Sequence, residues 1–215
     1  MKTTLRFWVA RSILRALISV VLRVRVDGLE GLPRKQPYIL ACNHLSWIDP
    51  FLLISYLPIT PRLHFLGKRS AVYNRAIKRW TLRFMGGVIP VESGDVERLC
   101  AAVMEVFQRG GVTVIFPEGG IGVTEGRLQS LRPGVAHFSM QSLAPVVAAG
   151  IAGTSELWRG KEVRLHVGRT VWPDRSWSVD VCLATIRTAL VEALPPDQQP
   201  AVGPRPWTWL THLLR

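Results

Sequence analysis

The sequence predicts an α/β fold in which a mixed, mostly parallel sheet is flanked by helices. Short apolar runs that are typical of buried strands alternate along the chain with longer segments of helical period. Glycine and proline separate the two kinds of segment. With 215 residues and a hydrophobic fraction of 48%, the chain can build one domain with a full core. We expect that layered domain over residues 23–194, preceded by an amphipathic helix at 1–22 and followed by a proline-rich linker and amphipathic tail at 195–215.

The charge of the chain favours a negatively charged partner. The formal net charge is +12 and the sequence pI is about 10.8. There is no zinc-finger spacing and no arginine or lysine repeat, so nucleic acid is not an expected partner. The basic residues are instead interleaved with apolar and aromatic ones, which suits a lipid surface. Cys42, Cys100 and Cys182 are odd in number and widely spaced, so we expect buried thiols and neither a disulfide framework nor a metal site.

The first segment, residues 5–22, has the pattern of a basic amphipathic helix. Its longest uncharged stretch, 16–22, falls well short of the ~20 residues that a membrane-crossing helix needs. Arg6, Arg11 and Arg15 interrupt the apolar residues, and no acid appears before Asp27. We therefore expect a helix that lies in the interface of an anionic membrane. The pattern fits equally a helix that packs on the protein's own core, and that alternative stays open.

The strands are predicted from apolar runs and from alternation. Residues 112–116 are the clearest buried strand, while 23–26 and 163–167 alternate between polar and apolar side chains. The segment 28–37 is expected to be a loop. The full set of expected strands is 23–26, 38–42, 63–67, 87–91, 112–116, 145–151 and 163–167.

The helices are predicted from capping residues and from helical period. One opens near Asp49 and is ended by the prolines at 58 and 61. Another, at 176–194, places its apolar residues on one face. The segment 70–85 is rich in basic and aromatic residues, and it provides a second expected membrane contact. The remaining expected helices are 96–108, which two glycines end, and 133–142.

Polar residues follow three of the predicted strands at the point where each strand ends. His44 and Asp49 follow the first, Lys68 and Arg69 follow the second, and Glu118 with several glycines follows the third. Open α/β sheets bind ligands at this edge. An imidazole that is held by a carboxylate can act as a general base. The alternative for Asp49 is a helix cap, and the alternative for Glu118 is a carboxylate that anchors its own loop by accepting backbone hydrogen bonds.

The motifs resemble those of the 1-acylglycerol-3-phosphate acyltransferase (PlsC-like) family. Asn43, His44 and Asp49 match the family's N-H-x4-D motif, and residues 116–119 match its FPEG block. Lys68 matches the lysine that the family places after the next strand, and 144–147 match an apolar block with proline. Residues 125–128 and 132–134 also look like the family, and the resemblance covers roughly 27–171.

The resemblance implies a membrane-bound acyltransferase of phospholipid biosynthesis. A fatty acyl group would pass from acyl-CoA or acyl carrier protein, as co-substrate, to a lysophospholipid hydroxyl, foremost that of 1-acyl-sn-glycerol 3-phosphate. No cofactor and no metal are expected, and the protein would lie on the cytoplasmic face as a peripheral or monotopic protein. His44 and Asp49 would be catalytic. The expected substrate-binding residues are Lys68, Arg69, Glu118, Gly119, Gly120 and Arg127.

Two positions depart from the family's pattern. The family has an arginine after the strand equivalent to 87–91, whereas residues 90–93 of this chain contain none. The FPEG block usually continues Thr-Arg-Ser, and here it continues Gly120-Ile121-Gly122. The resemblance implies that both missing arginines would grip the acceptor's phosphate, and Arg127, Lys68 or Arg69 are the expected substitutes. Two alternatives stay open: an acceptor that is another lysolipid or hydroxylated polar lipid, and a catalytically silent membrane-binding homologue.

Overall fold

The fold is built on one seven-stranded sheet. The computed structural model describes residues 4–33, 36–68, 87–91, 96–196 and 204–213. The strand order is β1-β7-β6-β2-β5-β3-β4, and only the pairing of β6 with β7 is antiparallel. The mixed, mostly parallel sheet predicted from the sequence is thus confirmed. The strands are β1 (Arg23–Asp27), β2 (Tyr38–Cys42), β3 (Leu63–Lys68), β4 (Val88–Val91), β5 (Val112–Ile115), β6 (Val146–Ala152) and β7 (Glu162–Val171).

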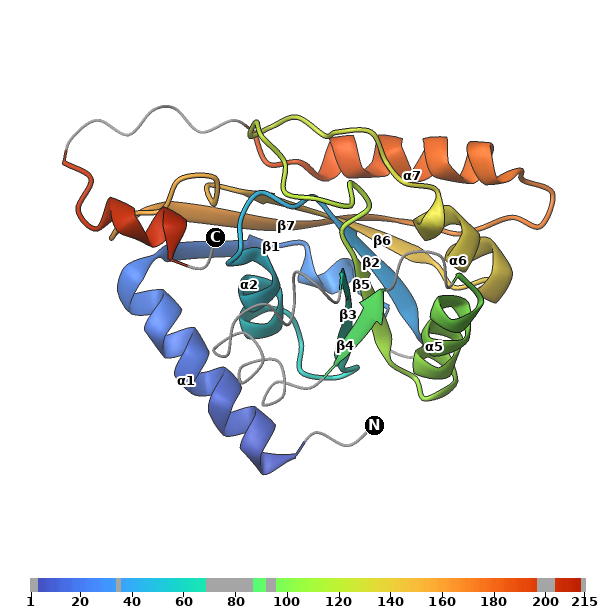
Figure 1. The fold of residues 1–215 in the computed structure, drawn as a ribbon, viewed down its shortest axis with the longest axis horizontal. Coiled ribbons are helices and arrows are strands. Elements are labelled where there is room, and N and C mark those ends of the chain that lie inside the picture. Colours follow the sequence, from blue (N-terminus) through green and yellow to red (C-terminus); the bar gives the residue numbers. More distant parts are fainter. Residues whose placement is uncertain (1–3, 34–35, 69–86, 92–95, 197–203, 214–215) are drawn as a thin grey trace.

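Helices cover both faces of the sheet and give a three-layer arrangement (Figure 1). On one face lie α5 (Val96–Gln108), α6 (Gly134–Ser142) and α7 (Val179–Ala193). On the other face lies α2 (Asp49–Tyr56), with α1 (Leu5–Val21) packed against it. The described residues also form two short 3₁₀ helices, η1 (Leu29–Gly31) and η2 (Thr208–His212).

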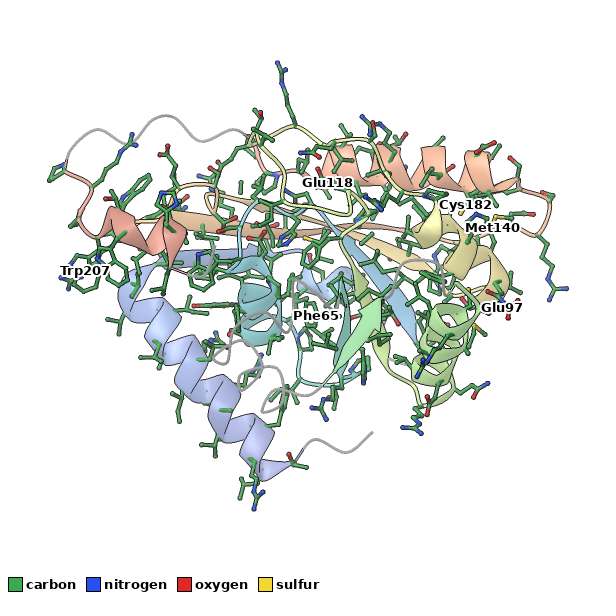
Figure 2. The ribbon with its side chains drawn as sticks, viewed as in Figure 1. Phe65, Glu97, Glu118, Met140, Cys182 and Trp207 are labelled. Atoms are coloured by element: carbon green, nitrogen blue, oxygen red, sulfur yellow. The ribbon has the colours of Figure 1, made fainter. Side chains whose placement is uncertain are left out.

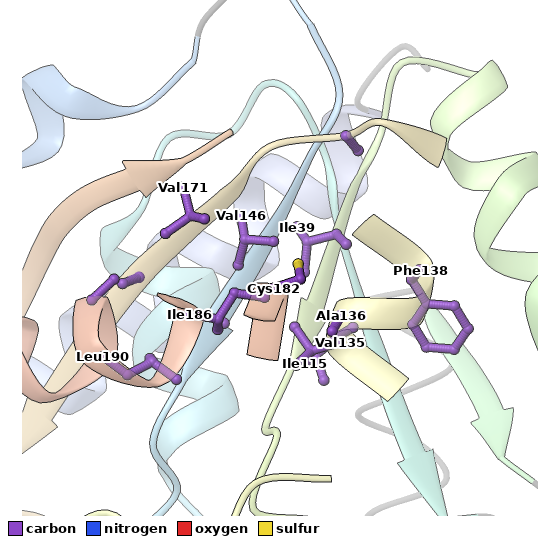
Figure 3. Close-up of a cluster of buried hydrophobic side chains, with 14 of the residues drawn as sticks. Ile39, Ile115, Val135, Ala136, Phe138, Val146, Val171, Cys182, Ile186 and Leu190 are labelled. Carbon is purple, nitrogen blue, oxygen red and sulfur yellow. The ribbon is translucent and has the colours of Figure 1, made fainter. Parts of the chain in front are cut away.

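The central strand β2 feeds both cores by simple alternation. Ile39 and Ala41 point into the cluster under α5, α6 and α7, where Cys182, Ile186 and Leu190 of α7 lie (Figure 3). Tyr38, Leu40 and Cys42 point into the opposite cluster, which contains Leu53 of α2 and Leu57 directly after that helix. Because successive side chains of a strand face opposite sides, a strand that is buried on both faces must be apolar throughout. This is why all five residues of β2 are buried.

Helix α1 has one face against the protein and one exposed apolar face. Phe7 and Ile18 are buried, and the Arg11 guanidinium donates to the carbonyls of Ile54 and Leu57 at the end of α2. A cation at that place satisfies unpaired carbonyls of the helix terminus. The opposite face carries Leu5, Trp8, Val9, Ile13, Leu17 and Val20, all exposed. The helix thus packs on the protein, as the open alternative allowed, and it still presents apolar side chains outward. None of the described helices is long and apolar enough to span a bilayer.

The tail near residue 208 docks on the domain. The indole Nε1 of Trp47 donates to the Leu210 carbonyl at 3.2 Å, and the Thr211 hydroxyl bridges the backbone of Leu157 at 2.9 and 3.2 Å. Leu210 packs with residues of α1 and α2. The sequence predicted only an amphipathic tail here, and its position against the turn before α2 is a finding of the structure.

Element boundaries otherwise follow the sequence closely. Strand β7 runs over Glu162–Val171, longer than the expected 163–167, and α7 starts at Val179 after the cap Ser178 rather than at 176. The loop expected at 28–37 contains η1. The helix expected at 70–85 lies outside the described residues.

Gly150 in β6 gives a test of how closely α7 packs on the sheet. A Cβ there would lie 2.1 Å from the Ala193 carbonyl oxygen, which is backbone and cannot easily move aside. We expect Gly150→Ala to destabilise the fold by about 1–3 kcal/mol or more through overpacking. Gly120→Ala is the control, because nothing lies within 4 Å of a Cβ at that position. Urea unfolding measures both variants, and equal midpoints would show that α7 does not press on β6.

Candidate active site

The predicted site residues gather at one edge of the sheet. Strands β2, β3, β5 and β6 are mutually parallel, so their carboxyl ends share this edge. His44 follows β2, Glu118 follows β5, and β3 ends at Lys68. Figure 2 shows Glu118 near the middle of the molecule, far from Trp207 in the docked tail. The backbone of Lys68 pairs with Val91 of β4, whereas Arg69 lies outside the described residues.

Asn43 fixes the point where the chain leaves the sheet. Its side-chain amide donates to the Ile151 carbonyl at 2.9 Å and accepts from the Ile151 N–H at 2.7 Å. Asn43 and Ile151 are both almost fully buried. Buried backbone groups need hydrogen-bond partners, and here one side-chain amide supplies both a donor and an acceptor to the backbone of β6. The start of the His44 turn is therefore tied to the neighbouring strand.

Asp49 shapes the turn and orients His44. A single carboxylate oxygen, Oδ2, accepts hydrogen bonds from His44 Nδ1 at 2.8 Å and from the Leu45 and Ser46 N–H groups at 2.6 and 2.8 Å. Asp49 is fully buried, and it is the first residue of α2. Its other oxygen, Oδ1, has no hydrogen-bond partner among the described residues. The carboxylate thus holds the local backbone as well as the imidazole.

Glu118 holds the other side of His44. One carboxylate oxygen accepts the His44 N–H at 3.0 Å and the other accepts the Gln129 N–H at 2.9 Å. The Gly122 N–H donates in return to the His44 carbonyl at 2.5 Å. Glu118 therefore has the anchoring contacts that the sequence left as an alternative to substrate binding. Any direct contact of its carboxylate with substrate stays a prediction.

The imidazole of His44 is held with one nitrogen available. Its ring stacks on Phe116, with 4.2 Å between ring centroids and 20° between planes. Because Nδ1 is engaged by Asp49, Nε2 is the nitrogen that can exchange a proton with a ligand. The side chain is 17% exposed, so a substrate can approach it. A buried carboxylate that orients an accessible imidazole is the arrangement of a general base.

Two buried carboxylates, those of Asp49 and Glu118, lie at the edge of the sheet where β2 ends. Burial raises the pKa of the Cys42 thiol well above its ordinary value, and the carboxylates of Asp49 and Glu118 raise it further. The described residues contain no group of three or more His, Cys, Asp or Glu that could hold a metal ion.

A cavity of about 650 Å³ opens beside the His44 turn. Leu45 and Gly122 line it on the side of the turn, and residues of the docked tail line it as well. Apolar residues mix with polar ones in the lining, which suits an amphiphilic ligand. The other lining residues are Val123, Ser155, Glu156, Leu157, Trp158, Arg205, Thr208, Trp209, Thr211 and His212.

The remaining predicted binding residues lie in the loop after β5. Gly119 has a positive φ of 72°, which favours glycine, and Gly120 borders open space. Arg127 is an exposed residue of the same loop, and its side chain makes no hydrogen bond or ion pair to another described residue. Sequence reasoning did not assign roles to Phe116 or to the Asn43 amide. Both residues lie inside motifs that match the family, and this position in a motif is the sequence feature that could have identified them.

The comparisons with known proteins agree on one family. The family model described as Acyltransferase matches residues 23–152, more than half of the chain. The 1-acyl-sn-glycerol-3-phosphate acyltransferase of Bacillus subtilis is 23% identical over 159 residues, which are 72% of this chain and 77% of that protein. The bovine (Bos taurus) 1-acyl-sn-glycerol-3-phosphate acyltransferase alpha is 26% identical over 86% of this chain. This chain spans only 60% of the length of that bovine relative.

A solved structure matches the fold. The crystal structure of the 1-acyl-sn-glycerophosphate (LPA) acyltransferase, PlsC, from Thermotoga maritima superposes with a TM-score of 0.70. The match covers 90% of this chain and 81% of the Thermotoga chain, at 19% identity. The layered acyltransferase-type architecture expected from the motifs is thereby confirmed.

The two hydrogen bonds between the Asn43 amide and the Ile151 backbone give a stability prediction. Asn43→Ala would leave the buried N–H and C=O of Ile151 without partners, so we expect a loss of about 2–5 kcal/mol in the free energy of unfolding. Ser46→Ala is the matched control, because the buried Ser46 side chain has no hydrogen bond to other described residues. Urea unfolding measures both variants. If Asn43→Ala lowers the free energy of unfolding by less than ~1 kcal/mol, the two hydrogen bonds do not stabilise the fold as proposed.

Proposed function

This chain belongs to the acyltransferase family, whose model matches residues 23–152, and from that premise we propose its substrates and mechanism. The enzyme transfers a fatty acyl group from the thioester of acyl-CoA or acyl carrier protein to a lysophospholipid hydroxyl. The preferred acceptor is 1-acyl-sn-glycerol 3-phosphate, and the product is phosphatidic acid. The observation that carries this proposal is the His44–Asp49 pair, 2.8 Å apart at the edge where the family motif predicts it.

The proposed reaction is a direct transfer. His44 Nε2 removes the proton from the acceptor hydroxyl while Asp49, at Nδ1, stabilises the imidazolium that forms. The acceptor oxygen attacks the thioester carbonyl carbon and forms a tetrahedral intermediate. The C–S bond then breaks, and the leaving thiolate takes the proton from His44. The new ester and a free thiol are the only products, so no covalent acyl-enzyme is required.

The backbone of the loop after β5 is the proposed source of oxyanion stabilisation. Developing negative charge on the carbonyl oxygen needs donors that are already in place. The Gly120 N–H has no acceptor among the described residues, and open space borders this residue. The glycines at this position therefore suit the close approach of a substrate to the backbone.

The choice of acceptor rests on the relatives. Bacterial and mammalian proteins similar to this chain are named as 1-acyl-sn-glycerol-3-phosphate acyltransferases. A second candidate is another lysolipid or a hydroxylated polar lipid, which the loss of arginine at Gly120-Ile121-Gly122 favours. A silent homologue is disfavoured because the catalytic pair is complete and the imidazole is accessible.

We also propose that the enzyme sits on the cytoplasmic face of a membrane through α1. The outward residues of this helix have exposed fractions between 44% and 78%, which is unusual for large apolar side chains in a row. The net charge of +12 adds attraction to anionic lipid. A peripheral position would also place the site near a lipid acceptor.

The first prediction tests catalysis. His44→Ala should lower acyl transfer to 1-acyl-sn-glycerol 3-phosphate by at least about 10²–10⁴-fold, because the general base is lost. Asp49→Asn should be severely impaired because the imidazole tautomer would change. Ser46→Ala should retain turnover close to that of the wild type, since this mechanism uses no serine nucleophile. Initial rates with acyl-CoA and with acylated acyl carrier protein identify the donor. Near-normal turnover by a folded His44→Ala variant would overturn the mechanism.

The second prediction tests the membrane contact. The double variant Ile13→Glu/Leu17→Glu should bind vesicles of mixed phosphatidylglycerol and phosphatidylcholine on the order of tenfold more weakly, because two exposed apolar side chains that would enter the lipid are replaced by charged ones. The matched control is Val181→Glu/Val191→Glu on α7, which changes the charge equally at comparably exposed residues on the other face of the sheet. Co-sedimentation measures binding. High salt should weaken wild-type binding only in part.

Two results would contradict the membrane proposal. One is a wild-type protein that stays in the supernatant at low salt with these vesicles. The other is equal binding by the α1 and α7 double variants, which would place the contact elsewhere.

A further inference from the structure

The loop after β5 folds back on itself beside His44. Its outgoing limb is tied to the His44 turn by the bond from the Gly122 N–H to the His44 carbonyl. Its returning limb is tied to the outgoing limb twice, by the Gln129 N–H on Glu118 and by the Arg132 N–H on the Pro117 carbonyl at 2.8 Å. These bonds bring residue 132 next to residues 117–119, although the two are well separated in the chain.

The side chain of Arg132 lies directly on Gly119. A Cβ built at Gly119 would come within 2.1 Å of Arg132 Nε and 2.9 Å of Cζ. The guanidinium therefore occupies space that is open only because residue 119 has no side chain. The preceding residue, Glu118, accepts the His44 N–H, so this cation stands beside the turn that carries the proposed base.

No described residue accepts a hydrogen bond from this guanidinium. Both oxygens of Glu118 are already used by backbone N–H groups. Arg132 is exposed, and its side chain makes no hydrogen bond or ion pair to another described residue. Open space lies alongside Gly120. The planar fork of N–H donors on this exposed side chain matches a phosphate group.

We propose that Arg132 binds the phosphate monoester of the acceptor. This assignment rests on the proposed function. It supplies the guanidinium that Gly120-Ile121-Gly122 cannot provide, and it selects Arg132 rather than Arg127, which has no contact that ties it to the His44 turn among the described residues. An acceptor without a phosphate would gain nothing from this residue.

The test compares two arginines of one loop. Initial rates are measured for wild type, Arg132→Ala, Arg132→Lys and Arg127→Ala, with 1-acyl-sn-glycerol 3-phosphate and with the phosphate-free 1-acylglycerol as acceptors. Arg132→Ala should raise the KM for the phosphorylated acceptor about 10- to 100-fold, as expected for a lost charge-assisted contact, and leave the KM for the acyl thioester within about twofold. Arg132→Lys should fall between the two, because a lysine keeps the charge without the fork. If Arg127 held the phosphate instead, Arg127→Ala would show that increase in KM and Arg132→Ala would not.

The outcomes separate the two proposals. Loss of inhibition by sn-glycerol 3-phosphate in Arg132→Ala, with an unchanged thermal midpoint, would support a binding role. If wild type turns over the phosphorylated acceptor and Arg132→Ala has an unchanged KM for it, the role of Arg132 alone is overturned. A raised KM for this acceptor in Arg127→Ala but not in Arg132→Ala would overturn that role as well. Wild type that acylates 1-acylglycerol but not its phosphate would overturn the proposed acceptor, and the role of Arg132 with it.

Discussion

The two-way hydrogen bond between the Asn43 amide and the Ile151 backbone is the contact on which the site depends. Strand β2 lies in the middle of the sheet, with β5 on one side and β6 on the other. When the chain turns away after Cys42, β6 would lose its partner, and the side chain of Asn43 replaces it. The chain can therefore leave a buried strand abruptly, and His44 begins its turn from a fixed point.

Carboxylates, more than apolar contacts, hold the site beyond that point. Asp49 accepts three hydrogen bonds and Glu118 accepts two, and four of these five donors are backbone N–H groups. Such a site is preorganised, because its shape does not wait for a ligand. It also carries two carboxylates, which add to the effect of burial in raising the pKa of the Cys42 thiol. The cation that we propose for the acceptor's phosphate, Arg132, comes from a surrounding loop.

The sequence predicted what depends on local pattern and missed what depends on long-range contact. The strands could be predicted from apolar runs and from alternation, and the spacing of the N-H-x4-D motif placed His44 and Asp49 together. The strand expected at 163–167 ended before Gly168, and glycine is a residue that weakens strands. In the structure, a Cβ at Gly168 would lie 2.7 Å from the Cβ of Ala193, so the glycine makes room for α7 instead. The contact between Trp47 and Leu210 joins residues 163 positions apart, and no local signal reveals it. The position of Arg132 depends on a loop that folds back, which spacing alone cannot show.

The bonds of Asp49 determine which changes the turn can accept. Its carboxylate engages the backbone of Leu45 and Ser46 and not their side chains, so the identity of these two residues matters to it only through the presence of an N–H. Proline is the one amino acid that removes this donor. An inserted or deleted residue would instead shift all three bonds of Oδ2 at once. The turn is therefore constrained in length more strictly than in composition. Homologous enzymes built this way can differ in the residues of the turn while they keep the number of residues between the histidine and the aspartate.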